Sequence, residues 1–213
     1  MDTNLYQADS SIWAAKYSLP DLLEQLPSSL HKRAKRYQFE QDGYNFVLGR
    51  LLLKQGLKDL GLKLSLDDLQ YEQSGKPFLK DVHFNISHSE NLVVCALSAQ
   101  GRLGIDVEKE RPITLGNFKS FFTPNEWEDI NTATKPLNKF YAYWTRKESI
   151  IKALGITLQH LHQISVDPLK DTFTANGHLW HLTELDLGEE CFGVLCTESS
   201  IDILKVETMM EAF

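Results

Sequence analysis

The sequence predicts an α+β, sandwich-like fold with two similar halves, and two observations support this prediction. In each half a long helical segment is followed by short strands, and each helix ends at a Leu-Gly pair, Leu60-Gly61 and then Leu154-Gly155. The repeated order suggests an internal duplication, although few residues are identical and chance order is the competing explanation. The joint falls near 100–102, which predicts domains 1–101 and 102–213.

The helices are predicted from apolar residues that recur three and four positions apart. Leu48, Leu51, Leu52 and Leu57 form one such stripe, and Gly61 after them is a typical helix stop. The predicted helices run from Pro20 to Phe39, from Gly43 to Leu60 and from Asn138 to Leu154.

The strands are predicted from short runs rich in β-branched and aromatic residues between turn residues. They are expected around Ser11 to Ala15, at Asp68–Gln73, His83–Ser87, Leu92–Ala99, Gly104–Glu108, Gln163–Val166, His178–Glu184 and Phe192–Thr197. Pro124–Glu126 and Asn131–Pro136 are predicted to be surface connections.

Composition narrows the class of protein. The net charge of −7 argues against a protein that binds nucleic acid, because such proteins display a basic face. No apolar run reaches the roughly 20 residues that cross a bilayer, and the amino terminus lacks the basic and apolar segments of a signal peptide. The three cysteines are odd in number and match no zinc spacing, so we expect reduced thiols in a cytoplasmic protein.

The segment Gly104-Ile105-Asp106-Val107-Glu108 is the first candidate site. Side chains two apart on a strand point to the same face, so Asp106 and Glu108 are expected together, and Gly104 allows another backbone to approach closely. An exposed strand with alternating charges is the alternative interpretation of an isolated Asp-x-Glu.

The segment Trp144 to Lys152 favours the functional interpretation. On a helix Trp144, Glu148 and Lys152 follow one another at i,i+4 positions along one side, although Glu148 and Lys152 alone would also fit an ordinary exposed pair. Three acids and one lysine suit a Mg²⁺ ion held against a phosphate ester, because Mg²⁺ takes about one to three carboxylates and fills its shell with water and phosphate oxygens.

Three further segments are candidate phosphate or base contacts. Ser87 and His88 in Phe84–Ser89 are expected at a turn, where they can donate hydrogen bonds to phosphate oxygens or cap their own backbone. Gly75-Lys76-Pro77 can present main-chain groups to a flat base, and is also a common turn. The basic run His31–Arg36 places Lys32 and Lys35 on one helix face, which suits a phosphate monoester or simply a solvated surface.

Taken together, these motifs resemble the 4′-phosphopantetheinyl transferases of the surfactin-synthetase-activating (Sfp) type. The resemblance rests on Gly104–Glu108 and Trp144–Lys152, with Gly75–Pro77 and Phe84–Ser89 upstream in the expected order and spacing. It implies two pseudo-symmetric halves, each a small, mostly antiparallel sheet packed with a long helix, and coenzyme A in the cleft between them. The implied activity is Mg²⁺-dependent transfer of phosphopantetheine from coenzyme A to a serine of an apo acyl or peptidyl carrier protein, with release of adenosine 3′,5′-bisphosphate.

The resemblance also implies roles for single residues. Asp106, Glu108 and Glu148 match the magnesium ligands, and Lys152 matches the pyrophosphate-binding lysine. Positions that match coenzyme A contacts are Ser87 and His88 near the phosphates, Gly75, Lys76 and Pro77 beside adenine, and Lys32 and Lys35 at the 3′-phosphate. Catalysis is expected from Glu148, Lys152 and Asp106, and the internal duplication implies a monomer.

Some alternatives remain open from the sequence. Glu148 is the first candidate for deprotonating the carrier serine. Leu115 and the aromatic stretch Phe118–Trp127 are candidates for carrier docking, and membership of the core is the competing role for the phenylalanines. A non-catalytic coenzyme-binding regulator and a metal-dependent phosphohydrolase that acts on a nucleotide are the rival functions.

Overall fold

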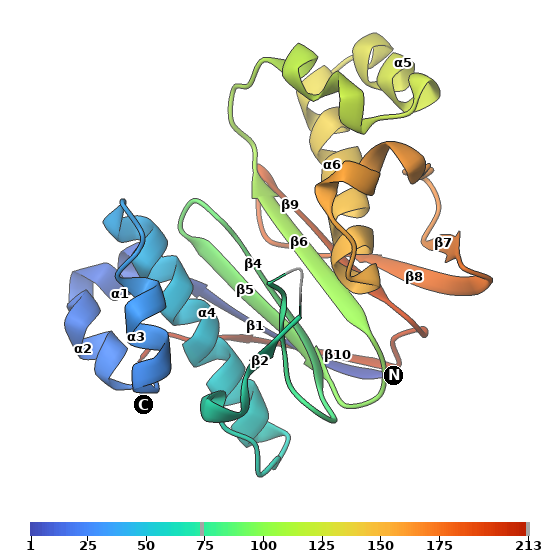
Figure 1. The fold of residues 1–213 in the computed structure, drawn as a ribbon. Coiled ribbons are helices and arrows are strands. Elements are labelled where there is room, and N and C mark those ends of the chain that lie inside the picture. Colours follow the sequence, from blue (N-terminus) through green and yellow to red (C-terminus); the bar gives the residue numbers. More distant parts are fainter. Residues whose placement is uncertain (73–74, 212–213) are drawn as a thin grey trace. The chain divides into compact units, whose positions relative to one another are not determined.

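The computed structural model describes residues 1–72 and 75–211, and it divides the chain into two compact units. The N-terminal unit contains Asp2–Gln100 and the chain from Ile203 onward, and the C-terminal unit contains Met1 and Gly101–Asp202. Figure 1 shows each unit as a sheet with one long helix across it. The last strand therefore belongs to the N-terminal unit, whereas the expected division assigned it to the second half.

The N-terminal unit is a four-stranded sheet covered by helices. Its elements are β1 (Asp2–Asp9), α1 (Ser10–Lys16), α2 (Leu19–Glu24), α3 (Ser28–Ala34), α4 (Glu40–Asp59), η1 (Leu66–Asp68), β2 (Gln70–Tyr71), β3 (Pro77–Phe78), β4 (His83–Ser89), β5 (Leu92–Ser98) and β10 (Ile203–Thr208). The sheet order is β10-β1-β5-β4, antiparallel except for the parallel pair β1–β10, and β2 and β3 form a separate two-stranded ribbon.

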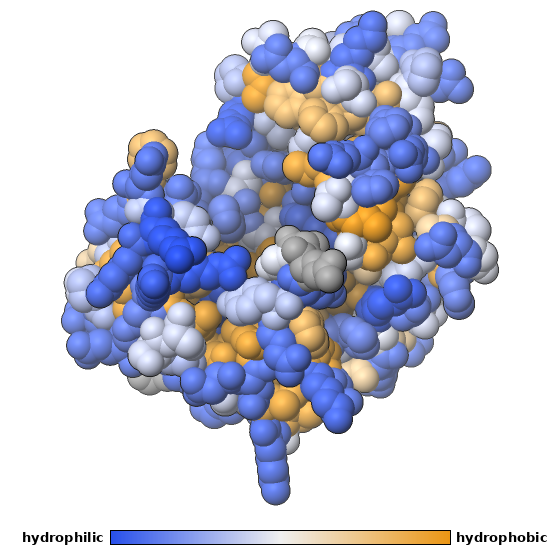
Figure 2. All heavy atoms as spheres, viewed as in Figure 1, coloured by the Kyte–Doolittle hydropathy of each residue, from blue (hydrophilic) through white to orange (hydrophobic). Residues whose placement is uncertain are grey.

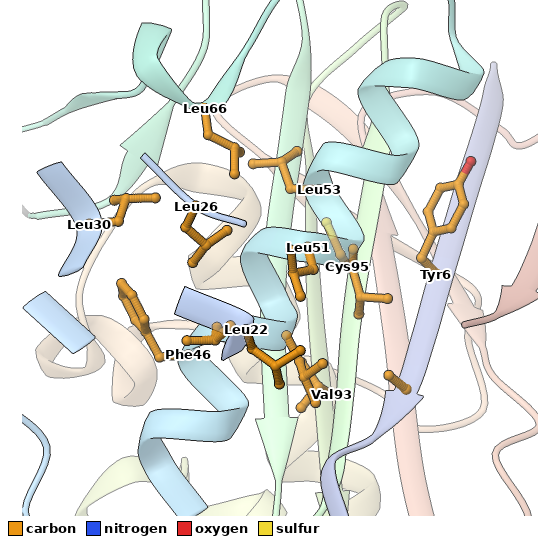
Figure 3. Close-up of a cluster of buried hydrophobic side chains, with 14 of the residues drawn as sticks. Tyr6, Leu22, Leu26, Leu30, Phe46, Leu51, Leu53, Leu66, Val93 and Cys95 are labelled. Carbon is orange, nitrogen blue, oxygen red and sulfur yellow. The ribbon is translucent and has the colours of Figure 1, made fainter. Parts of the chain in front are cut away.

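The core of the N-terminal unit surrounds α4. Figure 3 shows Leu51 of this helix beside Cys95 of β5 and Leu53 beside Leu66 of η1, with Leu22 of α2 and Leu30 of α3 on the other side of the helix. Because α4 is covered on both sides, its apolar residues extend beyond a single stripe. The predicted stripe is confirmed, since Leu48, Leu51, Leu52 and Leu57 are all buried.

The amino-terminal elements correct two predictions. The predicted strand at Ser11 to Ala15 is wrong, because the Asp9 carboxylate accepts hydrogen bonds from the Ser11 and Ile12 backbone N–H groups and so starts a helix there. The predicted helix from Pro20 to Phe39 is two helices, α2 and α3, separated at Pro27, which has no N–H to continue the first.

The C-terminal unit is an antiparallel sheet with α6 across it. Its elements are β6 (Leu103–Lys109), η2 (Leu115–Phe121), α5 (Pro124–Thr132), α6 (Pro136–Leu154), η3 (Leu158–Gln163), β7 (Thr172–Ala175), β8 (His178–Glu184) and β9 (Cys191–Thr197). The sheet order is β6-β9-β8-β7. Gly155 ends α6 in a left-handed conformation with φ 72°, as the predicted Leu-Gly stop requires.

The two units repeat one arrangement of strand, long helix and hairpin. In the N-terminal unit these are β1, α4 and β4–β5, and in the C-terminal unit they are β6, α6 and β8–β9, with the matching sheet orders β1-β5-β4 and β6-β9-β8. The fourth strand differs, because β10 adds beside β1 whereas β7 adds beside β8. The predicted α+β class, with two small sheets that each pack against a long helix, is confirmed.

Two predictions in the C-terminal unit are wrong, and a third is too long. Gln163–Val166 is not a strand, because its backbone groups bond to buried side chains: Ile164 O accepts from Lys147 and Val166 N donates to Glu126. Pro124–Glu126 is the first turn of α5 instead of a surface connection, since Thr123 and Glu126 cap it reciprocally. The predicted connection Asn131–Pro136 is confirmed for residues 133–135, which join the two helices, whereas its ends belong to α5 and α6.

None of the helices in the described ranges combines the length and the apolar character that crossing a membrane requires.

Candidate functional site

The site in the C-terminal unit begins with a close approach of β6 to α6. A Cβ atom on Gly104 would lie 2.3 Å from Ala153 N and 2.3 Å from Ser149 O, both backbone atoms of α6. Any side chain at this position would push the strand away from the helix. Glycine therefore sets the distance at which the acids of β6 face the last two turns of α6.

The predicted acids and lysine meet at this approach. Lys152 Nζ lies 2.6 Å from Asp106 Oδ1 and 3.7 Å from Glu148 Oε2. The Asp106 side chain is only 4% exposed, while the Glu148 and Lys152 side chains are 16% and 26% exposed. The cluster is thus buried at its base and open to solvent at Lys152, which leaves one side available to a ligand.

The charges in the cluster change one another's ionisation. Burial, followed by the Asp106 and Glu108 carboxylates, raises the pKa of Glu148 well above its usual range, and Lys152 opposes this. Burial disfavours the charged form of Lys152, but Asp106, Glu148 and Glu108 outweigh it and raise the pKa of Lys152. Lys152 therefore stays positive, and the three carboxylates carry more negative charge than one lysine neutralises.

Glu108 lies two residues beyond Asp106 on β6, and it is partly buried. Asp106 pairs with Val194 and Glu108 pairs with Phe192 on β9, so both acids lie on the regular part of the strand and share a face. The negative charge of Glu108 contributes to the raised pKa of both Glu148 and Lys152. Glu108 is therefore electrostatically part of the cluster.

A divalent cation fits this cluster by its chemistry. In the ranges 1–72 and 75–211, no three histidine, cysteine, aspartate or glutamate side chains are arranged as a ready metal-binding group. Three carboxylates nevertheless supply the oxygen ligands that Mg²⁺ prefers, and their mutual repulsion is what a cation would relieve. The residues that would hold it are Asp106, Glu108 and Glu148.

The basic residues of the N-terminal unit gather at the end of α3. A cleft of about 430 Å³ is lined by Ser29, Lys32, Arg33, Arg36 and Tyr37. Lys32 is thus placed at the cleft, whereas Lys35, the residue that follows α3, is exposed and not part of its lining. Figure 2 shows strongly hydrophilic surface on the α3 side of this unit.

Aromatic rings accompany these cations. The Arg33 guanidinium lies 4.7 Å from the centre of the Tyr71 ring, and the Arg50 guanidinium lies 3.9 Å from the centre of the Phe46 ring. Burial lowers the pKa of Arg50 to about 10, so Arg50 remains charged at neutral pH. The run from His31 to Arg36 signalled this basic surface in the sequence, but Arg50 lies within an apolar helix and carried no such signal.

The remaining predicted contacts lie in the small ribbon and in β4. Gly75 adopts φ +84°, a backbone conformation that favours glycine. Gly75 N donates a hydrogen bond to Glu72 O, and Glu72 N donates one to Lys76 O. Strand β3 begins directly afterwards, at Pro77. Gln73, the last residue of the predicted strand Asp68–Gln73, lies outside the described residues. Ser87 and His88 belong to β4 and not to a turn; Ser87 is buried and His88 is exposed.

Two family models match consecutive parts of the chain. The model described as "4'-phosphopantetheinyl transferase, N-terminal" matches residues 13–100, and the model of the 4′-phosphopantetheinyl transferase superfamily matches residues 102–190. The 4′-phosphopantetheinyl transferase HetI of Nostoc sp. is 33% identical over 186 residues, which cover 81% of this chain and 78% of HetI. The chain belongs to the 4′-phosphopantetheinyl transferase superfamily.

Other members of the superfamily match over shorter stretches. A 4′-phosphopantetheinyl transferase of Bacillus subtilis is 32% identical over 168 residues, 76% of this chain and 72% of that protein. The transferase Sfp of Bacillus subtilis strain 168 is 35% identical over 131 residues, 58% of each chain. The superfamily match contains all four residues of the β6–α6 cluster, and the N-terminal match contains Lys32, Lys35, Gly75–Pro77, Ser87 and His88.

Sequence reasoning missed a second charged pair beside the cluster. Lys147 and Glu126 are almost completely buried, with Lys147 Nζ 2.6 Å from Glu126 Oε2. The sequence offered no sign of this burial, because Lys147 sits among other charged residues and Glu126 was expected on the surface. A Thr-x-x-Glu pattern at Thr123–Glu126 before an apolar position was the one available signal for the helix that places Glu126.

Proposed function

We propose that the chain transfers the 4′-phosphopantetheine arm of coenzyme A to a serine of an apo acyl or peptidyl carrier protein and releases adenosine 3′,5′-bisphosphate. The observation that carries the proposal is the cluster of Asp106, Glu148 and Lys152 across the approach of β6 to α6, in a chain that belongs to the transferase superfamily. We propose that the protein works as a monomer in the cytoplasm.

The roles of the cluster follow from its charges. Asp106, Glu108 and Glu148 would hold Mg²⁺, which when bound supplies positive charge to the pyrophosphate of coenzyme A. Lys152 keeps its proton and is partly exposed, so it can donate hydrogen bonds to a phosphate oxygen. Asp106 holds the Lys152 ammonium group in place at 2.6 Å.

The chemical step is a displacement at the β-phosphorus of coenzyme A. The serine Oγ–H bond breaks and an Oγ–P bond forms, while the bond from the β-phosphorus to the bridging oxygen breaks and adenosine 3′,5′-bisphosphate leaves with that electron pair. Glu148 is the group proposed to take the serine proton, directly or through a water, because it lies beside Lys152 in the cluster. Lys152 stabilises the charge on the departing phosphate.

Coenzyme A recognition is assigned to the N-terminal unit. We propose that Lys32, with Arg33 and Arg36 of the same cleft, holds the 3′-phosphate, and that the exposed Lys35 adds to the local positive charge. Gly75, Lys76 and Pro77 would contact adenine, and Ser87 and His88 would contact the phosphates.

Carrier docking is proposed at η2 and its surroundings. Phe122 is buried, and Phe118 and Phe121 are partly buried against Trp144, so these rings belong largely to the core. Figure 2 shows apolar surface in the part of the C-terminal unit that η2 and α5 form. Leu115, which also packs at the edge of this cluster, is the better probe; a Leu115→Ala variant with an unchanged carrier KM would remove the docking proposal.

One assay tests the proposed function. The protein is incubated with coenzyme A, Mg²⁺ and an apo carrier protein, and the carrier is then weighed by mass spectrometry. A gain of one phosphopantetheine group on the carrier is the expected result. Free phosphopantetheine without a change in the carrier would identify a phosphohydrolase, and no reaction at all would identify a coenzyme-binding regulator.

A further inference from the structure

An ion pair that no proposed step uses lies buried behind the catalytic face of α6. Lys147 is 0% exposed and Glu126 of α5 is 3% exposed, and their charged atoms are 2.6 Å apart. Lys147 Nζ also donates to Ile164 O at 2.6 Å. Glu126 accepts from Thr123 N at 2.8 Å and from Val166 N at 2.9 Å. The pair thereby ties α5, the segment 164–166 and α6 together at one point.

Stability alone does not account for this pair. Removing two charges from water costs free energy that can exceed their attraction, and well-packed apolar side chains in their place are often neutral or stabilising. The charged pair restricts the orientation of α6, because each of its hydrogen bonds forms only within a narrow range of distance and angle. An apolar pair would allow α6 to rotate or slide slightly in its groove.

Rotation of α6 would matter because Lys147 immediately precedes Glu148. Neighbouring residues on a helix point about 100° apart, so Lys147 faces α5 while Glu148 faces β6. A rotation of α6 by about 20° would move a side-chain end at the helix's outer radius of about 6 Å by about 2 Å. The distance of 2.6 Å between Lys152 and Asp106 would not survive such a shift.

We infer that the buried Lys147–Glu126 pair is a positioning device, which fixes the rotation of α6 so that Glu148 and Lys152 face Asp106. The inference rests on the proposed transferase function. Lys147 and Glu126 touch no reacting atom in this account, and their effect passes through the turn of α6 that they hold.

The test compares a neutral double variant with the wild type. Lys147→Met together with Glu126→Leu removes both charges at similar volume, so neither partner is left buried alone. Four quantities are measured: the melting temperature, kcat, the KM for coenzyme A, and the dissociation constant for Mn²⁺ by electron paramagnetic resonance. Tyr143→Phe is the matched control, because Tyr143 lies one turn before Lys147 and its hydroxyl donates to Asp129 of α5 at 2.8 Å.

The expected result distinguishes a role in positioning α6 from a role in the stability of the fold. The melting temperature of the double variant should fall, because Ile164 O, Thr123 N and Val166 N lose their side-chain partners. At a temperature where circular dichroism shows both proteins folded, it should lose at least tenfold in kcat and bind Mn²⁺ at least fivefold more weakly, with the coenzyme A KM within twofold. Tyr143→Phe should keep the wild-type kcat and Mn²⁺ affinity. A double variant with unchanged kcat and Mn²⁺ binding would overturn the inference.

A second variant covers the case in which the double variant does not fold. Lys147→Arg keeps a positive charge opposite Glu126, but its longer forked group cannot occupy the same point between Glu126 and Ile164. It should lower kcat and weaken Mn²⁺ binding, and wild-type values for both would overturn the inference. An inactive wild-type protein would refute the proposed function itself, whereas a fully active variant refutes only the positioning role.

Discussion

Replacing Gly104 by alanine is the sharpest perturbation of the site that leaves every charged group in place. The new Cβ would stand 2.3 Å from two backbone atoms of α6, at Ser149 and Ala153, where ordinary contact begins at 3.4 Å. Backbone atoms of a helix cannot turn aside as a side chain can, so β6 and α6 must separate by about 1 Å at this point. Asp106 and Glu108 would move away from Glu148 and Lys152 by a similar amount.

The cost can be estimated from this displacement. Overpacking of this kind costs about 1–3 kcal/mol of unfolding free energy, or about 2–12 °C in melting temperature at about 2–4 °C for each kcal/mol. A shift of about 1 Å between reacting groups costs about 100-fold in rate. The variant should therefore remain folded at 25 °C and yet lose most of its activity.

The measurements are a thermal melt followed by circular dichroism and the initial rate of carrier modification. Gly101→Ala is the matched control, because its Cβ would meet its nearest neighbour, Met1 Sδ, at an ordinary 3.5 Å. The control should match the wild type in both measurements. If Gly104→Ala gave the wild-type melting temperature and rate, the proposed role of the strand–helix approach would be wrong.

Three further predictions concern the charged cluster. Glu148→Gln should lower the transfer rate about 100-fold or more, and a full rate would exclude both proposed roles of Glu148. Its melting temperature without added metal should equal or exceed that of the wild type, because a buried charge that faces Asp106 is removed. Lys152→Met should lower the free energy of unfolding in urea by about 1–3 kcal/mol, because the buried Asp106 loses a hydrogen-bond partner, and an unchanged value would show that their contact contributes little. Chelation of divalent cations by EDTA should abolish transfer and excess Mg²⁺ should restore it, and activity that persists in EDTA would exclude the assigned metal role.

The parts of the fold that the sequence predicted are those that depend on local pattern. Helix α4 carries a stripe of leucines, and α6 ends at a glycine that alone suits its left-handed stop. The strand acids Asp106 and Glu108 and the helix pair Glu148 and Lys152 were predicted because spacings of two and four residues fix which side chains share a face. The contact of 2.6 Å between Lys152 and Asp106 needed the packing of α6 on β6, for which Gly104 was the sequence signal.

The parts that could not be predicted depend on partners far along the chain. Strand β10 pairs in parallel with β1 from 201 residues away, Asp2 with Ile203, and no local pattern specifies such a neighbour. Burial of Lys147 and Glu126 likewise depends on three separate segments meeting. At α1 a local signal did exist, since Asp9 is a residue that caps helices. The prediction gave more weight to the residues that follow Asp9, which by themselves favoured a strand.

We propose that the cluster on β6 and α6 catalyses transfer of phosphopantetheine to a carrier serine. The most direct test of this proposal is the intact mass of an apo carrier protein after incubation with coenzyme A and Mg²⁺, for the wild type and for Glu148→Gln side by side. The expected result is a gain of one phosphopantetheine group with the wild type and little or none with Glu148→Gln in the same time. An unmodified carrier with the folded wild type, or equal modification by both proteins, would contradict it.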